Sequence, residues 1–355
     1  MRGGPVAELC AVFAFELFEG PVLARPVIFA FSPMARGRGP LERLREAAEK
    51  YGYILAGSNN SRNGDWPDSE AAIRSMPTDV TARFSVDRKR VYTAGLSGVS
   101  RVAMQVALNS GGKIAGVIAC SAGFPDAQPR KSVPFVIFAT AGTEDFNNLE
   151  MRRLDRALNS PHRLMIFEGT HDWLPSNLAG DAIEWLEVQA MKSGLRPRDE
   201  ALLDKIFAAR VAEASAQPSE LKALVADFDG LHDVTGYAAR AAEWERQKDV
   251  QATFKKERFL EQREEQMIGE VKTLEKGLGS PDKRSDCLTE LRDRLSDLSR
   301  RANVKDDSED RRLARRVFHG TFVRSFERLN DPEYQKLLNE VWAAGAKIRH
   351  FTGNN

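Results

Sequence analysis

Cysteine is scarce in this chain of 355 residues, and Cys10, Cys120 and Cys287 lie far apart without any CxxC pair. Three isolated thiols form neither a disulfide framework nor a zinc site, and at least one must remain outside any disulfide. The chain also lacks a run of eighteen uncharged apolar residues, so we predict no membrane span. It lacks a charge excess too, because 52 Lys and Arg residues balance 51 Asp and Glu residues. This balance argues against a nucleic-acid partner, which normally requires concentrated basic charge.

The first twenty residues, MRGGPVAELCAVFAFELFEG, match a signal peptide poorly. Glu8 and Glu16 interrupt the apolar run, and no small-x-small cleavage site follows it cleanly. The sequence therefore contains no clear signal peptide, and both a cytoplasmic and an exported location stay open.

Charge is unevenly distributed and divides the chain near residue 196. Charged residues make up about 22% of residues 1–196 and about 37% of residues 197–355, and twelve of the sixteen prolines lie in the first part. Low charge with many Pro and Gly residues is typical of buried strands joined by loops. High charge with few Pro and Gly residues is typical of helices exposed on one face. The length is at or above the usual ceiling for one core, so we predict two domains, 1–196 and 197–355.

Short apolar runs alternate with helical patterns in the first part. The runs are β-branched and aromatic with little polar alternation, as expected for strands covered on both faces; they span 26–31, 53–57, 91–96, 114–120, 135–139 and 164–167. Helical spacing lies between them, over 41–50, 69–84, 100–109, 149–158 and 180–192. This alternation predicts an α/β fold with a mostly parallel sheet and flanking helices. An edge strand is predicted over 12–18.

The second part is predicted to be all-α, as a bundle or as superhelical hairpins. One apolar seam consists of Leu288, Leu291, Leu295, Leu298 and Ala302, and another of Leu260, Met267, Val271, Leu274 and Leu278. A glycine C-cap and a proline stop over 277–282 separate the two seams, which predicts two packed helices. Further helices are predicted over 200–214, 219–247, 310–329 and 332–349, with Asn330-Asp331-Pro332 between the last two.

One strand-to-helix corner can carry chemistry, in RVYTAGLSGVSRV over 90–102. A helical pattern begins directly after Ser97, so the serine occupies a strained turn that presents its hydroxyl above the sheet edge. The residue two before it must be small because strand and helix pass close together, and Gly95 meets this need. Gly98 offers a backbone N–H to an oxyanion at a helix N-terminus. Val99 departs from the usual GxSxG pattern.

A serine nucleophile needs a base, and the base needs a third group that fixes its tautomer. Of the five histidines, only His171 directly follows a predicted sheet strand, in FEGTHDWLP. Glu144 or Asp145 supplies an acid after the preceding strand, in FATAGTEDFN. The order of serine, acid and histidine, each after a different strand, is that of an α/β-hydrolase triad.

The motifs FSPMARGRG, GSNNSRNG, VYTAGLSGVSRVA, GTEDFN and FEGTHDW follow one another along residues 20–192. In this order they resemble the α/β-hydrolase serine esterases of the polyhydroxybutyrate depolymerase and feruloyl esterase type. The resemblance implies Ser97 as nucleophile, His171 as general base and then acid, and Asp145 as its orienting carboxylate.

The resemblance also implies an oxyanion hole, built from the N–H of Gly98 and an N–H near Met34 or Ala35. The loop after the second core strand is rich in Asn and Gly, which ordinary turn chemistry explains. It should nevertheless lie beside the serine at the same sheet edge. We therefore expect the substrate pocket to include Asn60, Ser61 and Arg62. Trp173 is predicted either to form an aromatic wall of the same pocket or to pack in the core.

These residues predict a serine carboxylic-ester hydrolase that forms an acyl-enzyme and requires no cofactor or metal. The expected substrate is a small-molecule or polymeric ester, and amide or peptide hydrolysis by the same triad stays open. A second hypothesis makes the helical part a protein-binding module carried by a weak or inactive hydrolase domain, which Val99 and the Met34–Ala35 loop favour. The helical part is also a candidate surface for a homo-oligomer or a protein partner.

Overall fold

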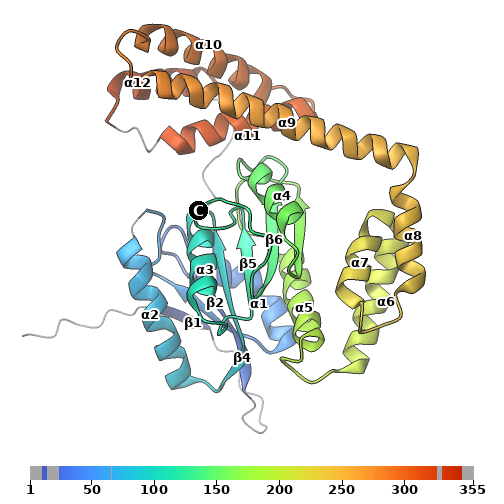
Figure 1. The fold of residues 1–355 in the computed structure, drawn as a ribbon. Coiled ribbons are helices and arrows are strands. Elements are labelled where there is room, and N and C mark those ends of the chain that lie inside the picture. The colour runs from blue at the N-terminus through green and yellow to red at the C-terminus, as the bar shows by residue number, and fades with distance from the viewer. Residues whose placement is uncertain (1–9, 14–23, 65, 326–329, 346–355) are drawn as a thin grey trace, which may run out of the picture. The chain divides into compact units, whose positions relative to one another are not determined.

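The computed structural model describes residues 10–13, 24–64, 66–325 and 330–345 (Figure 1). The chain divides into two compact units. The first comprises Met1–Ala141, Glu150–Phe167 and Asp172–Gln247, and the second comprises Gly142–Leu149, Glu168–His171 and Lys248–Asn355.

A seven-stranded sheet with the order β1-β3-β2-β4-β5-β6-β7 dominates the first unit. Its strands are β1 Cys10–Phe13, β2 Arg25–Phe31, β3 Ile54–Ser58, β4 Val86–Leu96, β5 Gly116–Cys120, β6 Val136–Gly142 and β7 His162–Phe167. Strands β2 to β6 are parallel, and β1 pairs antiparallel with β3. The predicted edge strand thus begins at Cys10, and residues 14–18 of that prediction lie outside the described residues.

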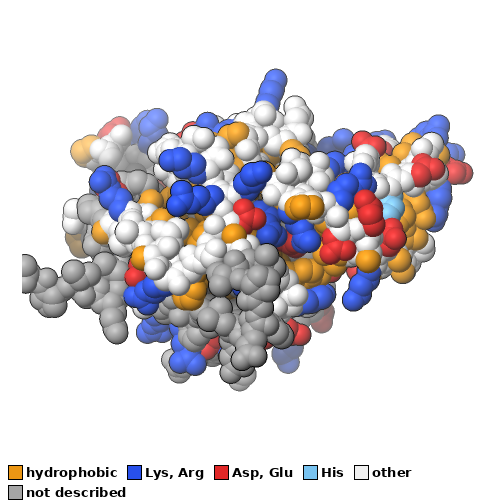
Figure 2. All heavy atoms as spheres, turned by 90° about the horizontal axis from the view of Figure 1, so that it is seen from below, with side chains coloured by type: hydrophobic (Ala, Val, Ile, Leu, Met, Phe, Trp, Pro, Cys, Tyr) orange, Lys and Arg blue, Asp and Glu red, His pale blue; other side chains and the backbone are white. Residues whose placement is uncertain are grey.

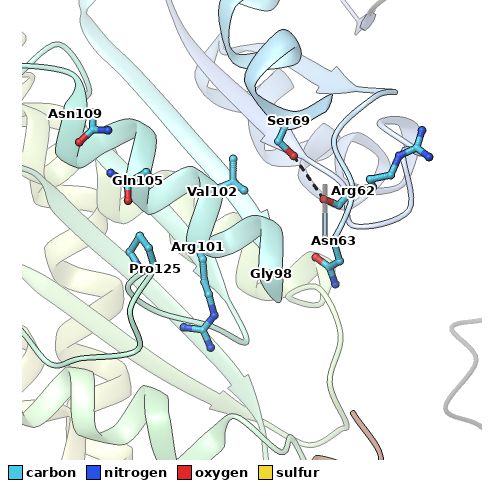
Figure 3. Close-up of a pocket in the computed structure, with 10 residues that line it drawn as sticks. Arg62, Asn63, Ser69, Gly98, Arg101, Val102, Gln105, Asn109 and Pro125 are labelled. Atoms are coloured by element: carbon cyan, nitrogen blue, oxygen red, sulfur yellow. Dashed lines mark hydrogen bonds between the residues drawn. The ribbon is translucent and has the colours of Figure 1, made fainter. Parts of the chain in front are cut away.

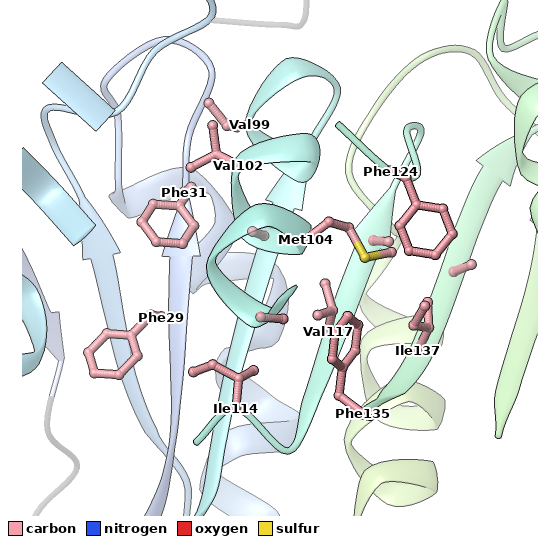
Figure 4. Packing of buried hydrophobic residues seen from close by; sticks show 14 of the residues in the cluster. Phe29, Phe31, Val99, Val102, Met104, Ile114, Val117, Phe124, Phe135 and Ile137 are labelled. Carbon is pink, nitrogen blue, oxygen red and sulfur yellow. The ribbon is translucent and has the colours of Figure 1, made fainter. Parts of the chain in front are cut away.

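Helices cover both faces of this sheet, because successive strand residues point to opposite sides. Phe29 and Phe31 of β2 pack in a cluster with α2 (Trp66–Arg83), α3 (Gly98–Asn109) and α4 (Asn148–Ala157), as Figure 4 shows in part. Ile28 and Ala30 pack in the opposite cluster, with α1 (Arg38–Tyr51) and α5 (Ser176–Lys192). The predicted fold class, a mostly parallel sheet of α/β-hydrolase type with flanking helices, is confirmed.

Helices α6 (Glu200–Ala216), α7 (Leu221–Phe228) and α8 (Thr235–Glu245) also belong to the first unit. They share a core with α5, built from residues that include Val188, Met191, Leu203, Ile206 and Phe228. Arg163 on β7 also connects the sheet to this helical group, through ion pairs of 2.9 Å with Glu220 and with Asp227. The predicted boundary at residue 196 therefore does not coincide with the division between compact units, which falls after Gln247.

The single helix predicted over 219–247 is wrong. The structure has a short 3-10 turn, Pro218–Glu220, followed by α7 and α8. The chain turns between α7 and α8, where Gly230 has a φ of 80°. Glycine adopts this left-handed conformation without steric cost, and one such residue interrupts a helix.

Four helices make up most of the second unit: α9 (Lys248–Gly277), α10 (Arg284–Ala302), α11 (Glu309–Arg324) and α12 (Pro332–Ala344). The two predicted seams meet in their core, where Val271, Leu278, Leu291, Leu295 and Leu298 are buried. Asp331 caps α12 by accepting a hydrogen bond from the Tyr334 N–H at 3.2 Å. The predicted helical character is confirmed, and residues 326–329 and 346–349 of the predicted helices lie outside the described residues.

The surface in Figure 2 shows basic and acidic side chains interspersed with hydrophobic and uncharged groups. No helix among the described residues is both long enough and apolar enough to cross a membrane.

Candidate active site

Ser97 occupies the turn between β4 and α3, with φ 59° and ψ −131°. This backbone conformation is rare for a residue with a side chain and stores strain. Gly95 makes the turn possible, because a Cβ atom there would lie 2.4 Å from the Val99 carbonyl oxygen and 2.7 Å from the Ser100 nitrogen. The predicted need for a small residue two before the serine is confirmed.

Strained backbone gathers at this edge of the sheet. Ala35, Ser97 and Ser121 have φ values of 55°, 59° and 58°. They follow the C-terminal ends of β2, β4 and β5, and these three strands are parallel neighbours. Such conformations cost on the order of 1–3 kcal/mol each and cluster at functional sites. The edge predicted to carry the chemistry is therefore also the edge that stores strain.

A histidine and a carboxylate lie in the second unit, on two segments that continue strands of the sheet. Asp145 follows β6 and His171 follows β7. The Nδ1 atom of His171 lies 2.8 Å from Oδ1 of Asp145, and Asp145 is fully buried. Of the two acids left open by the spacing, Asp145 is thus the one that contacts the imidazole. With Nδ1–H donated to the carboxylate, Nε2 is left as a proton acceptor.

Several contacts fix this pair. The ring of Phe146 stacks on His171 with 4.0 Å between ring centroids. The Glu144 N–H donates a hydrogen bond to the Gly169 carbonyl at 2.9 Å and so joins the two segments. A Cβ atom at Gly142 would lie 2.3 Å from the Thr170 carbonyl oxygen, so only glycine allows the segments to approach this closely.

Ser97 belongs to the first unit, whereas His171 and Asp145 belong to the second. Within the first unit, the Ser97 N–H donates to the Cys120 carbonyl at 2.9 Å. The next residue, Ser121, donates its hydroxyl to the carbonyl of Asp172 at 3.2 Å, and Asp172 directly follows His171 in the chain. The convergence of all three residues in one triad stays a prediction.

Backbone N–H groups near Ser97 could form an oxyanion hole. The Ala35 N–H already donates to the Ser61 carbonyl at 3.0 Å, next to the bridge that pairs Met34 with Arg62. Among the described residues of the first unit, the N–H groups of Met34 and Gly98 donate to no backbone carbonyl in a turn, loop or cap. Gly98 begins α3, where the first N–H groups lack partners inside the helix. The Ala35 N–H is thus already engaged, and the role of Met34 beside Gly98 stays a prediction.

A pocket of about 410 Å³ opens beside Gly98 (Figure 3). Its lining combines polar residues, which include Arg62, Asn63, Arg101, Gln105 and Asn109, with apolar surface to which Val102 and Pro125 belong. Glu150 holds the Arg101 guanidinium through two contacts of 2.7 Å.

Of the four predicted pocket residues, Arg62 lines this pocket. Ser61 is buried, and its hydroxyl accepts from the Ser32 N–H at 3.0 Å and donates to the Ser32 carbonyl at 3.1 Å. Trp173 is 8% exposed and belongs to the core between the sheet, α1 and α5. Asn60 is partly exposed, and its N–H donates to Ser58 Oγ at 3.2 Å.

The pocket residues on α3 are not among the predicted site residues. Arg101, Gln105 and Asn109 recur at four-residue spacing after the serine turn, which places them on one helix face. This spacing was the available signal. None of the described residues form a group of three or more His, Cys, Asp or Glu side chains that could hold a metal ion.

No family model matches the chain, and none of the curated proteins matches it. Similar solved structures include an S-formylglutathione hydrolase from Staphylococcus aureus, with 16% identity and a TM-score of 0.38 over 47% of this chain and 83% of that chain. A carboxylesterase from Bacillus cereus has 15% identity and a TM-score of 0.39 over 51% and 95%. A ferulic acid esterase has 16% identity and a TM-score of 0.38 over 50% and 90%.

Proposed function

We propose that the protein is a serine carboxylic-ester hydrolase. The observation that carries the proposal is the strained turn at Ser97, which presents a hydroxyl at the C-terminal edge of a parallel sheet. The hydrogen bond between His171 and Asp145 supports it, because it leaves one imidazole nitrogen to accept a proton. The hydrogen bond from the Ser121 hydroxyl to the Asp172 carbonyl also supports it. Asp172 follows His171 in the chain, and Ser121 follows Cys120, whose carbonyl accepts the Ser97 N–H.

In the proposed mechanism, Nε2 of His171 takes the hydroxyl proton of Ser97 as Oγ attacks the ester carbonyl carbon. Asp145 stabilises the imidazolium that forms. His171 then gives this proton to the leaving alcohol, and an acyl-enzyme remains on Ser97. Water attacks the acyl group with the same base, which releases the acid and restores the serine.

The negative charge that develops on the carbonyl oxygen needs donors that are already oriented. We assign this role to the N–H groups of Gly98 and Met34. Removal of one such donor raises the barrier by about 3–4 kcal/mol in comparable sites. The positive end of the α3 dipole acts in the same direction.

The pocket beside Gly98 is proposed to hold a polar part of the ester. Its amide side chains, Asn63, Gln105 and Asn109, can donate and accept hydrogen bonds, whereas a long aliphatic chain would leave them unpaired. Substrates with a hydroxylated or otherwise polar acyl or alcohol group are therefore favoured. Replacement of Gln105 by Leu should raise KM for such an ester with little change in kcat.

Hydrolysis of short p-nitrophenyl esters tests the proposal. Ser97→Ala should reduce kcat/KM by several orders of magnitude, about 10⁴-fold or more, and Asp145→Asn by about 10⁴-fold, because the imidazole would take the wrong tautomer. Ser110→Ala, at the other end of α3, is the matched control and should retain activity. A fluorophosphonate should label Ser97 in the wild type. An unlabelled Ser97 together with no turnover of any ester would refute the proposal, and a panel of anilides separates amide from ester hydrolysis.

A further inference from the structure

Helix α11 contacts the two segments that carry Asp145 and His171, and it does so entirely within the second unit. The contacts come from charged side chains of the run 305–316, whose alternating signs in the sequence are typical of a solvated helix face. Arg311, Arg315 and Arg316 are instead largely buried, with side chains 16%, 24% and 12% exposed.

Glu144, the residue directly before Asp145, is held by two of these arginines. Nη1 of Arg315 lies 2.8 Å and 2.7 Å from the two carboxylate oxygens of Glu144. Nη2 of Arg311 adds a third contact of 3.1 Å. Arg315 is itself fixed, because its Nε donates to the Ala302 carbonyl of α10 at 2.8 Å. The backbone on the N-terminal side of Asp145 is thus tied to two helices.

Arg316 holds the same segment through its backbone. Its Nη1 donates to the Thr143 carbonyl at 2.7 Å. Its Nε and Nη2 donate to the carboxylate of Glu264 on α9, at 2.9 Å and 2.6 Å. Glu264 is 2% exposed, so this pair is almost fully removed from water. A guanidinium with two fixed partners has little freedom to move, and neither has the carbonyl that it holds.

The histidine segment makes an ion pair with α11 as well, although the Glu168 side chain of this pair is 73% exposed. Arg312 pairs with Glu168, three residues before His171, at 3.1 Å. On the other side of Asp145, a Cβ atom at Gly320 of α11 would lie 3.3 Å from the Cβ of Phe146, the residue whose ring stacks on His171. Helix α11 therefore contacts residues on both sides of the acid and a residue of the histidine segment.

We propose that Glu144, Arg315 and Arg316 are positioning residues for the His171–Asp145 pair, and that α9 to α11 form the scaffold of this half of the active site. The catalytic meaning of the pair rests on the proposed function, whereas its geometry does not. A general base works only when its atoms are held within a fraction of an ångström, and a displacement of about 1 Å can reduce the rate on the order of 100-fold. Helical residues distant in sequence provide this constraint for two short loop segments.

The charges of the cluster explain why single replacements should matter. Glu144 is 8% exposed, so loss of Arg315 leaves a buried carboxylate with Arg311 as its remaining arginine partner, at the residue directly before Asp145. The neighbouring His319 adds no charge near neutral pH, because burial, followed by the field of Arg315, lowers its pKa to about 4. The buried charge of Glu144, no longer fully paired, is costly. We expect the segment to shift so that Glu144 reaches water, and Asp145 to move with it.

The test uses the full chain and the variants Arg315→Met, Arg316→Met and Glu144→Gln. Arg292→Met is the matched control, since Arg292 forms an exposed ion pair with Glu340 on α12 of the same unit. The first readout is the downfield proton resonance of the His171 Nδ1–H bonded to Asp145, assigned by its loss in His171→Ala. The second is kcat and KM for a p-nitrophenyl ester, and the third is thermal unfolding.

The three variants should lose or shift the resonance and lower kcat by about 10- to 100-fold, with KM changed by less than about twofold. Arg292→Met should match the wild type in the first two readouts, and Arg315→Lys should recover part of both losses. If the methionine variants do not fold, Arg315→Lys and Glu144→Asp are compared with the wild type, and both should weaken the resonance.

An unchanged resonance and an unchanged kcat in folded variants would overturn the proposal. If the wild type hydrolyses no ester but the resonance responds as expected, the proposed function fails and the positioning role stands. If turnover responds in Arg292→Met as strongly as in Arg315→Met, the effect is one of general stability and the positioning role is rejected.

Discussion

Replacement of Gly95 by alanine tests the geometry of the serine turn most directly. The added Cβ atom would lie 2.4 Å from the Val99 carbonyl oxygen and 2.7 Å from both the nitrogen and the Cα of Ser100. All three atoms are backbone atoms of α3 and cannot rotate away. Since real Cβ contacts essentially never fall below 3.0 Å, β4 and the start of α3 must separate by at least about 0.6 Å.

The size of the effect follows from this displacement. Overpacking of a rigid core site costs about 1–3 kcal/mol, and contact with backbone atoms on one side puts Gly95→Ala at the upper end, about 3 kcal/mol. Ser97 lies inside the segment that must move. Because a shift of about 1 Å can cost on the order of 100-fold in rate, kcat/KM should also fall, by about 10-fold or more.

The assay is urea unfolding monitored by circular dichroism, combined with p-nitrophenyl ester hydrolysis. Gly180→Ala is the control, because this glycine lies inside α5 and a Cβ atom there would have no neighbour within 4 Å. Alanine in a helix interior is favoured over glycine by about 0.5–1 kcal/mol, so the control should be stabilised. A Gly95→Ala protein as stable and as active as Gly180→Ala would refute the reasoning.

Two further predictions concern buried charge. Burial lowers the pKa of His319 to about 4 from its ordinary 6.5. Between pH 4 and pH 6.5, the imidazole is therefore protonated in the unfolded chain and neutral in the folded chain. The free energy of unfolding should therefore fall by about 3 kcal/mol as the pH drops from about 6.5 towards 4, and urea titrations of His319→Gln should lack this part of the decrease. Asp227→Ala should cost about 3 kcal/mol, because it removes one partner of Arg163 and the acceptor of the Trp185 indole N–H at 2.6 Å. A loss below about 1 kcal/mol in thermal unfolding would contradict this estimate.

The sheet and the serine turn could be predicted because their signals are local. Strands buried on both faces read as continuous apolar runs, and the structure has a strand at each of the six runs. The requirement for glycine at position 95 also follows from the chain path alone, since only two residues separate it from the start of α3.

The environments of Ser61 and Trp173 could not be predicted from the sequence, because they depend on distant segments. Ser61 belongs to a loop with ordinary turn residues, and its burial depends on hydrogen bonds to Ser32, 29 residues earlier. Trp173 follows the candidate base in sequence, yet the packing of the sheet against α1 and α5 draws its side chain into the core. Sequence proximity to a functional residue therefore does not predict which way a side chain points.

The role of the charged helix was equally hidden, for a different physical reason. A charge pattern along a helix defines a face but not the partner of that face, and the partner of Arg315 lies 171 residues earlier, at Glu144. Composition alone favours solvent for such a run. A buried ion pair contributes little net stability, because desolvation opposes the attraction, but breaking it is costly and its geometry is narrow. Such pairs are poorly suited to stabilise a fold and well suited to hold a short segment in one position, which is what a loop that carries an acid for an imidazole requires.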